Sequence, residues 1–163
     1  MANLIYMQPE AQITWLDSGG TNVLTLTSLA SLAGRQGALH DFGATTARSR
    51  LYRWRFYCQF ATTPVLGERV EVYAKTGDGT HRDNDDGTDD AALSSVEKLR
   101  NLSLLGVLSV DEATADLEMS CSGTIAIESR EFQPVIYNRT ADALTATASE
   151  HGFTLTPVPD EIQ

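Results

Sequence analysis

Residues 51–63 read Leu-Tyr-Arg-Trp-Arg-Phe-Tyr-Cys-Gln-Phe-Ala-Thr-Thr. Every second position carries an aromatic or apolar side chain: Tyr52, Trp54, Phe56, Cys58 and Phe60. Arg53 and Arg55 lie between them. Because successive side chains of a strand point to opposite faces, the pattern predicts a β-strand with one apolar face and one cationic face. The apolar face requires a second layer of structure to cover it, whereas the arginines face water or a partner.

Short runs typical of β-strands recur along the rest of the chain, with turn residues between them. The expected strands are 12–16, 22–27, 69–75, 102–110, 117–121, 124–128, 132–138, 144–148 and 153–158. The first two are expected to form a hairpin. The nearly continuous apolar run 102–110 is typical of a strand in the centre of a sheet, and Pro134 indicates an edge strand because proline cannot donate to the ladder.

The number and spacing of these runs predict an all-β fold, a β-sandwich, rather than alternating strands and helices. The chain of 163 residues is the size of one domain. Ser94 and Glu97 have the spacing of a capping box, which predicts one short helix over 94–99. We interpret 28–47, rich in Gly, Ala and Ser, as a connector or contact arm, and 158–163 as a loosely held tail.

The charge balance limits the possible partners. Twelve Lys and Arg against 22 Asp and Glu give a net charge of -10, which repels nucleic-acid backbones. No segment approaches the roughly 20 apolar residues that cross a bilayer, and no export signal is recognisable, so we expect neither membrane insertion nor export. Cys58 and Cys121 both fall at apolar strand positions and are expected to be buried thiols rather than a disulfide, which is compatible with a cytoplasm.

A run of aspartates over 77–90 is the most acidic part of the chain. The candidate calcium ligands are Asp83, Asp85, Asp86, Asp89 and Asp90. Calcium binds carboxylate oxygens, but placing Gly87 at the glycine position of an EF-hand loop puts Arg82 at its first ligand position, so that motif fails. The alternative is a solvated surface loop, and no metal is assigned.

Recognisable catalytic motifs are absent from the sequence. His40, His81 and His151 stand alone and are expected in loops or at the surface, and no nucleophile elbow, phosphate-binding loop or dinucleotide-binding motif occurs. Acidic pairs such as Asp111 with Glu112 could serve a glycosidase, but such pairs are usually solvated turns. We therefore expect a protein that is not an enzyme and needs no cofactor.

Four of the twelve basic residues fall within eight positions that contain no acid: Arg48, Arg50, Arg53 and Arg55. Guanidinium groups bind carboxylates bidentately and are favoured in interfaces, so these arginines are candidates for binding an acidic partner. The alternative is ion pairing within the chain, for which Glu71 on the next expected strand is a candidate acceptor.

Four stretches carry a family resemblance: 50–56 (RLYRWRF), 73–87 (YAKTGDGTHRDNDDG), 133–144 (QPVIYNRTADAL) and 155–161 (LTPVPDE). Together they resemble small virion structural proteins of tailed bacteriophages over roughly 52–162. The resemblance implies a jelly-roll sandwich that decorates or cements the capsid by binding the major capsid protein lattice, with contacts between its own copies. It also implies a place in the virion, which is assembled in the host cytoplasm.

The same resemblance leaves an alternative open, a tail or fibre module that binds a host-surface glycan. Such a module would use exposed aromatic residues, for which Tyr6, Trp15 and Tyr137 are candidates, together with the acidic loop. A glycan-active enzyme on the same scaffold is the third possibility.

Overall fold

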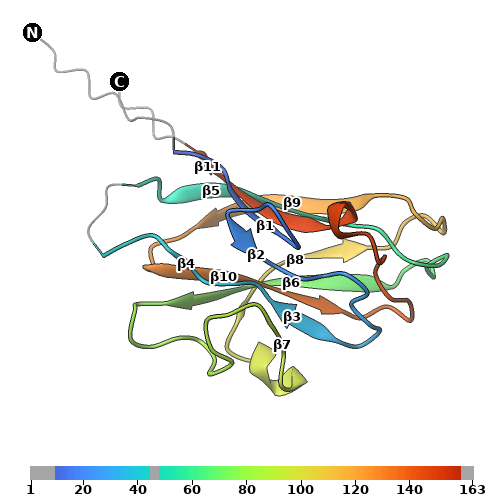
Figure 1. Cartoon of the computed structure of the whole chain (residues 1–163), viewed down its shortest axis with the longest axis horizontal. Helices are drawn as coiled ribbons and strands as arrows, with labels where there is room; N and C mark the ends of the chain where they lie inside the picture. The colour runs from blue at the N-terminus through green and yellow to red at the C-terminus, as the bar shows by residue number, and fades with distance from the viewer. Residues whose placement is uncertain (1–9, 45–47, 159–163) are drawn as a thin grey trace, which may run out of the picture.

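Two β-sheets stack face to face in the computed structural model, which describes residues 10–44 and 48–158 (Figure 1). The first sheet has the order β2 (Asn22–Val23), β1 (Ile13–Leu16), β11 (Gly152–Val158), β5 (Leu51–Cys58) and β9 (Met119–Ala126). The second has the order β7 (Ala91–Ala92), β3 (Gly34–Gln36), β10 (Glu131–Asn138), β6 (Arg69–Gly77) and β8 (Ser103–Ser109), and β4 (His40–Asp41) also pairs with β10. The predicted all-β sandwich is confirmed.

The core lies between the sheets, and the inner face of β5 forms much of it. All five apolar residues of the 51–63 pattern are buried, four of them in β5 and Phe60 just after it. Trp54 stacks on Phe153 of β11, and Trp15 of β1 packs edge to face against Phe132 of β10 and Phe153. Of these contacts, the one between Trp15 and Phe132 joins the two sheets, and the other two lie within the first sheet.

Eight longer strands pair in a nested order. β1 pairs with β11, β3 with β10, β5 with β9, and β6 with β8, and every one of these pairs is antiparallel. The first of these strands therefore pairs with the last, the second with the second last, and so on inward to the β6–β8 pair. Each sheet contains two of the four pairs.

Three local predictions are wrong. The expected opening hairpin is absent, because β1 and β2 pair in parallel. The runs 117–121 and 124–128 form one strand, β9, with no turn at Ser122-Gly123. Gly123 is needed there for space, since a Cβ at this position would lie 2.9 Å from Nε1 of Trp54. Within 144–148, Leu144 makes only an isolated bridge to Phe60.

Two predictions about strand position are also wrong. The apolar run 102–110 forms β8, which is an edge strand. Pro134 lies in β10, which is central, but it faces the break between β3 and β4. Its carbonyl accepts a bond from the Gly37 N–H (2.8 Å), and because N–H and C=O of a strand residue point to the same side, the missing N–H also faces this break.

The remaining segments are short. The predicted helix is a 3-10 turn, η1 (Val96–Leu99), whose N-cap is Ser95, while the Ser94 hydroxyl donates to Asp86 instead. A second 3-10 turn, η2 (Ala148–Glu150), precedes β11. The expected connector 28–47 contributes β3 and β4 to the second sheet, and its residues 45–47, like 159–163 of the tail, lie outside the described residues.

Both cysteines are free thiols, as predicted. They lie on adjacent strands of the first sheet, where burial raises the pKa of the Cys121 thiol to about 11 and raises that of Cys58 further. Within 10–44 and 48–158, no helix has the length and apolar character needed to span a membrane.

Candidate binding site

Three arginines surround a pocket of about 410 Å³ at one end of the sandwich. Arg48 and Arg50 precede β5, and Arg130 precedes β10. The other lining residues are Gly43, Ala44, Ile127 and Glu128. The Ile127 N–H donates to the Arg50 carbonyl (2.8 Å), which fixes the end of β9 against the start of β5. We call this site the arginine pocket.

Arg48 is only partly used by internal contacts. Its Nη2 donates to the Ser129 carbonyl (2.6 Å), and its guanidinium lies 4.2 Å from the centre of the Phe42 ring. Its Nη1 is buried and has no hydrogen-bond partner among the described residues. A buried donor without an acceptor is unfavourable, and the Arg48 guanidinium adds positive charge to the wall of the arginine pocket.

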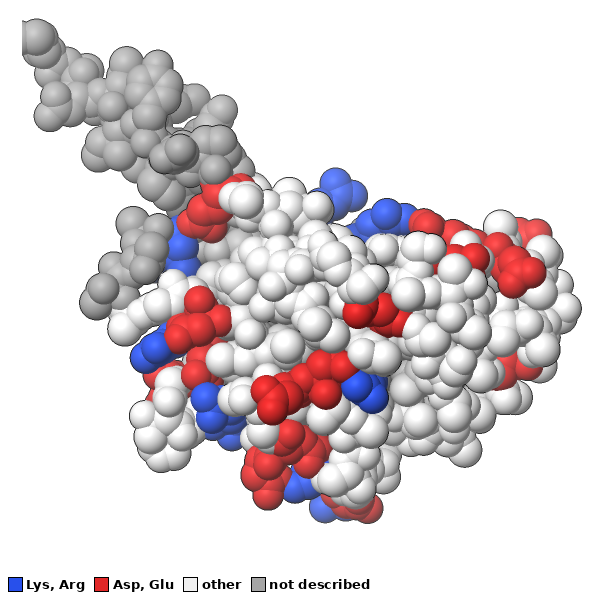
Figure 2. All heavy atoms as spheres, in the orientation of Figure 1, with Lys and Arg blue, Asp and Glu red and all other residues white. Residues whose placement is uncertain are grey.

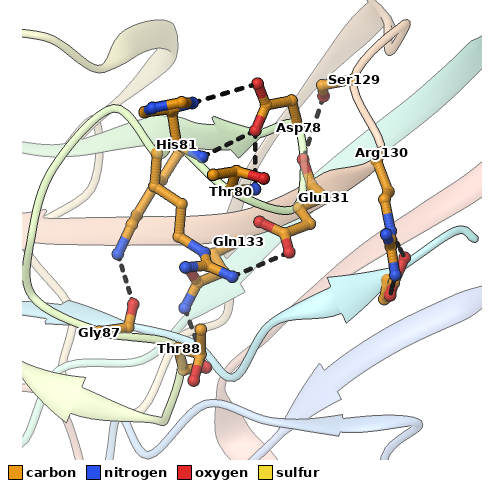
Figure 3. A network of polar contacts seen from close by, with 12 residues as sticks. Asp78, Thr80, His81, Gly87, Thr88, Ser129, Arg130, Glu131 and Gln133 are labelled. Carbon is orange, nitrogen blue, oxygen red and sulfur yellow. Dashed lines mark hydrogen bonds and ion pairs between the residues drawn. The ribbon is translucent and has the colours of Figure 1, made fainter. Parts of the chain in front are cut away.

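Arg130 is held in place by Asp41. Its Nε and Nη2 donate to the two carboxylate oxygens of Asp41 at 2.9 and 2.6 Å. Figure 3 shows Arg130 beside Glu131 at the start of β10. The hydrogen bond from Arg130, with another from the Gly43 N–H, holds the pKa of the Asp41 carboxyl well below its usual range. Arg130 and Asp41 therefore both stay charged over the physiological pH range.

Arg53 and Arg55 lie apart from the pocket, on the outer face of the first sheet. Arg55 forms an ion pair with Glu118 (2.5 Å) and lies 5.3 Å from the centre of the Tyr57 ring. Arg53 is exposed and makes no side-chain hydrogen bond or ion pair in the part of the chain that the structure describes. The four predicted arginines therefore divide between two places.

Glu71 pairs with neither Arg53 nor Arg55, so the prediction that it accepts an ion pair from these arginines is wrong. It lies in β6 of the other sheet, where Arg69 and Arg139 donate to its carboxylate at 3.1 and 2.9 Å and the Tyr73 hydroxyl donates at 2.8 Å. Burial alone would raise the pKa of Glu71, but these hydrogen bonds outweigh burial and lower it.

Short hydroxyl side chains surround the two outer-face arginines. In the register of the sheet, Arg55 lies between Thr154 and Ser122, and Arg53 lies between Thr156 and Thr124. Because these neighbours are short, the arginines stand above a low polar surface. Sequence alternation predicts the exposure of the arginines, but the neighbours on β9 and β11 come from distant parts of the chain.

The aspartates of the acidic loop are separated by their internal partners. The Thr76 N–H and hydroxyl donate to Asp83, Ser94 donates to Asp86, and Lys98 forms an ion pair with Asp85. Asp90 binds Arg35, and Asp89 is exposed. No group of three or more His, Cys, Asp or Glu side chains suited to a metal ion occurs within 10–44 and 48–158.

The loop covers a buried polar network on the outer face of the second sheet (Figure 3). Lys75 is buried, and its Nζ donates to the Gly87 carbonyl (2.6 Å) and to Gln36 (3.1 Å). Gln133 donates to the Thr88 carbonyl (3.1 Å). Burial lowers the pKa of the Lys75 ammonium. The acidic loop is thus fastened to the sheet through its backbone carbonyls, which is a structural role.

Asp90 also holds the acidic loop in place, and its contribution to stability depends on pH. Burial alone would raise the pKa of its carboxyl, but hydrogen bonds from Arg35 and Thr25 outweigh burial and hold the pKa below its ordinary value. A depressed pKa contributes stability above the unfolded-state pKa of about 4, and that stability is lost as the pH falls through the folded-state value.

We expect Asp90→Asn to lower the free energy of unfolding by about 1–3 kcal/mol at pH 7. Urea titrations at several pH values measure it, and the difference from wild type should shrink below about pH 4 because protonation removes the same charge. Asp89→Asn, an exposed neighbour, is the control and should change little at any pH. An Asp90→Asn deficit that stays constant down to pH 2 would contradict this assignment.

Two histidines differ from the expectation of a loop or surface position: His40 lies in strand β4 and is half-buried, and His151, in the loop before β11, is buried. His151 is fully buried, with Nδ1 3.8 Å from a carboxylate oxygen of Asp17. Asp17 in turn accepts bonds from the Leu26 and Thr27 N–H groups and from the Thr27 hydroxyl. Asp17 therefore fixes the loop after β2, and both ring nitrogens of His151 are buried without a hydrogen-bond partner among the described residues.

Two of the three aromatic residues considered for glycan binding, Trp15 and Tyr137, are not at the surface. Trp15 is fully buried and its indole N–H donates to the Ala38 carbonyl (2.8 Å). Tyr137 is 7% exposed, and its hydroxyl donates to the Leu32 carbonyl (2.9 Å). Tyr6 lies outside the described residues. The described aromatic candidates therefore serve the core and not a sugar-binding surface.

Comparison of the sequence with protein-family models and with curated proteins finds no match. The arrangement of charged groups is therefore what bears on function: an arginine pocket at one end of the sandwich and two exposed arginines on a hydroxyl-rich sheet face.

Proposed function

We propose that the protein is a jelly-roll decoration or cement protein of a bacteriophage virion, and that it binds the major capsid protein lattice. The nested strand pairs support the jelly roll. Numbered along the chain, the eight long strands have the orders 1-8-3-6 and 2-7-4-5 in the two sheets. A doubled ribbon wound into two Greek keys produces these orders, and viral capsid domains are among the proteins that use this architecture.

The observation that carries the binding role is the exposed arginine surface in an acidic chain. Arg53 has no internal partner among the described residues, and the chain has a net charge of -10. Arginine binds carboxylates bidentately and is enriched in interfaces. Arg53 and Arg55 would contact acidic side chains of the capsid protein. Binding at many equivalent lattice positions would give such weak contacts a high total avidity.

The binding role is tested by charge reversal. Arg53→Glu should weaken binding to capsid shells that lack the protein by at least about tenfold, because it replaces an attractive contact with a repulsive one. Arg100→Glu is the matched control, since it makes the same charge change at an exposed position after η1, beside the second sheet. Cosedimentation of purified protein with shells measures both. Equal binding of the two variants would overturn the role of Arg53.

A tail or fibre module that binds a glycan is the alternative proposal. It has lost two of its candidate contacts, because Trp15 and Tyr137 are buried. Quantitative staining of purified virions separates the two proposals, since a capsid decoration protein is present in far more copies than a tail component. A copy number that matches the tail would overturn the capsid assignment.

A further inference from the structure

The two sides of the sandwich end in very different strands. On one side the sheets end in β2 and β7, which have two residues each. On the other side they end in β8 and β9, with seven and eight residues. Very short edge strands protect a sheet against pairing with another chain, so only the first side is protected by length. We call the second side the β8–β9 edge.

Composition does not protect the β8–β9 edge either. Residues 103–109 and 119–126 contain no Asp, Glu, Lys, Arg or Pro, the residues that usually block an edge. Leu104 and Val107 of β8 are 56% and 39% exposed. The sequence of β8 is that of a central strand, and this is why a central position is predicted for it. An apolar strand at an edge indicates that something covers it.

A groove of about 600 Å³ separates the two edge strands. Leu104 and Leu105 of β8 line one wall, and Thr124, Ile125 and Ala126 of β9 line the other. Within the described residues, no strand pairs with the outer side of β8 or β9. Their outward N–H and C=O groups are therefore available to a partner strand.

We propose that this edge binds a second copy of the chain. Because the sheets are stacked, one two-fold axis perpendicular to both layers brings β9 against β9 and β8 against β8, each pair antiparallel. Both sheets then continue from one subunit into the other. The register of β8 is irregular opposite Val72 and Tyr73, so β9 and the Gly106–Ser109 part of β8 provide the regular pairing.

Charge complementarity selects a second copy over other occupants. The loop that joins β8 to β9 carries Asp111, Glu112 and Asp116, which are exposed and form no ion pair within the described residues. Figure 2 shows acidic side chains at the right-hand end of the molecule, where Figure 1 places this loop. The arginine pocket lies at the opposite end of β9, beside Ile127 and Glu128.

Antiparallel pairing places opposite ends of β9 together. The 110–118 loop of each subunit therefore meets the arginine pocket of the other, and the two-fold axis produces this contact twice. Elsewhere two chains of charge -10 repel each other, whereas the strands of the β8–β9 edge carry no formal charge. This inference goes beyond the proposed function, because it concerns the isolated protein.

The test is the mass of the isolated protein, measured by light scattering during gel filtration at about 1 to 100 µM, the range in which weak and moderate interfaces dissociate. We expect twice the chain mass of 17.7 kDa. Val107→Lys with Ser122→Lys should give the single-chain mass, because like charges face each other across the axis. Val23→Lys with Leu32→Lys adds the same charges at exposed positions outside the β8–β9 edge, and should stay dimeric.

A second measurement separates loss of pairing from loss of folding. Amide hydrogen exchange of wild type should slow at 103–109 and 119–126 as protein concentration rises, with no such change in β2 or β7. Arg50→Glu and Glu112→Arg should each weaken the dimer, and their combination should recover part of it. A single-chain mass at every concentration, or a dimer that survives Val107→Lys with Ser122→Lys, would overturn the proposal without affecting the capsid-binding test.

Discussion

Replacing Trp54 with alanine is expected to lower the free energy of unfolding by about 3–5 kcal/mol. The indole is buried between the sheets and stacks on Phe153. It lies so close to Gly106 of β8 and Gly123 of β9 that a Cβ at either glycine would come within 3.0 Å of it. Because glycine side chains cannot move in to fill the space, the cavity left by alanine should remain open.

Urea unfolding followed by far-ultraviolet circular dichroism measures this change. Leu51→Ala is the matched control, because Leu51 lies in the same strand but faces outward, and it should change stability by no more than about 0.5 kcal/mol. If Trp54→Ala were as mild as Leu51→Ala, the indole would not be the main contact between the two layers at this edge.

A second large loss in the free energy of unfolding is expected when Asn138 is replaced with alanine. Its buried side-chain amide donates to the carbonyls of Leu29, Ala30 and Asp142 and accepts bonds from the N–H and hydroxyl of Thr140. Asn138→Ala leaves several buried polar groups without partners, at about 1–3 kcal/mol for each group that water does not reach. We expect a total loss of roughly 3–5 kcal/mol.

Thermal and urea unfolding measure the Asn138 effect. Asn101→Ala is the control, since Asn101 is exposed and, like Asn138, begins an Asn-X-Ser/Thr sequence. Burial of Asn138 also means that this position cannot accept a glycan in the folded protein. A loss below about 1 kcal/mol would show that the loops around Asn138 are held by other contacts.

The alternation in 51–63 predicts the buried face of β5 correctly because side-chain direction in a strand depends only on local geometry. Edge and central positions depend on which strands come together, and composition predicts them only indirectly. Pro134 looks like an edge residue, but a break in the neighbouring strand allows it a central place. β8 looks central, but no strand covers its second side within the described residues.

The candidate site was likewise predictable only in part from the sequence. Sequence identifies Arg48 and Arg50 as an unusual cluster, and alternation predicts that Arg53 and Arg55 face outward. It does not identify Arg130, which reaches the pocket because β10 follows β9 across the sandwich. It also assigns Glu71 to the wrong arginines, since β5 and β6 are consecutive in the chain but lie in different sheets.

The nested pairing has a consequence for the order of folding. The β6–β8 pair can form early during synthesis, whereas β11 lies between β1 and β5 and pairs Ile13 with Leu155. The first sheet therefore stays open until β11 has left the ribosome. Such long-range pairing makes folding slow and leaves β1 and β5 exposed in the meantime. Chaperones that hold nascent chains should therefore increase the yield of this protein more than its size alone suggests.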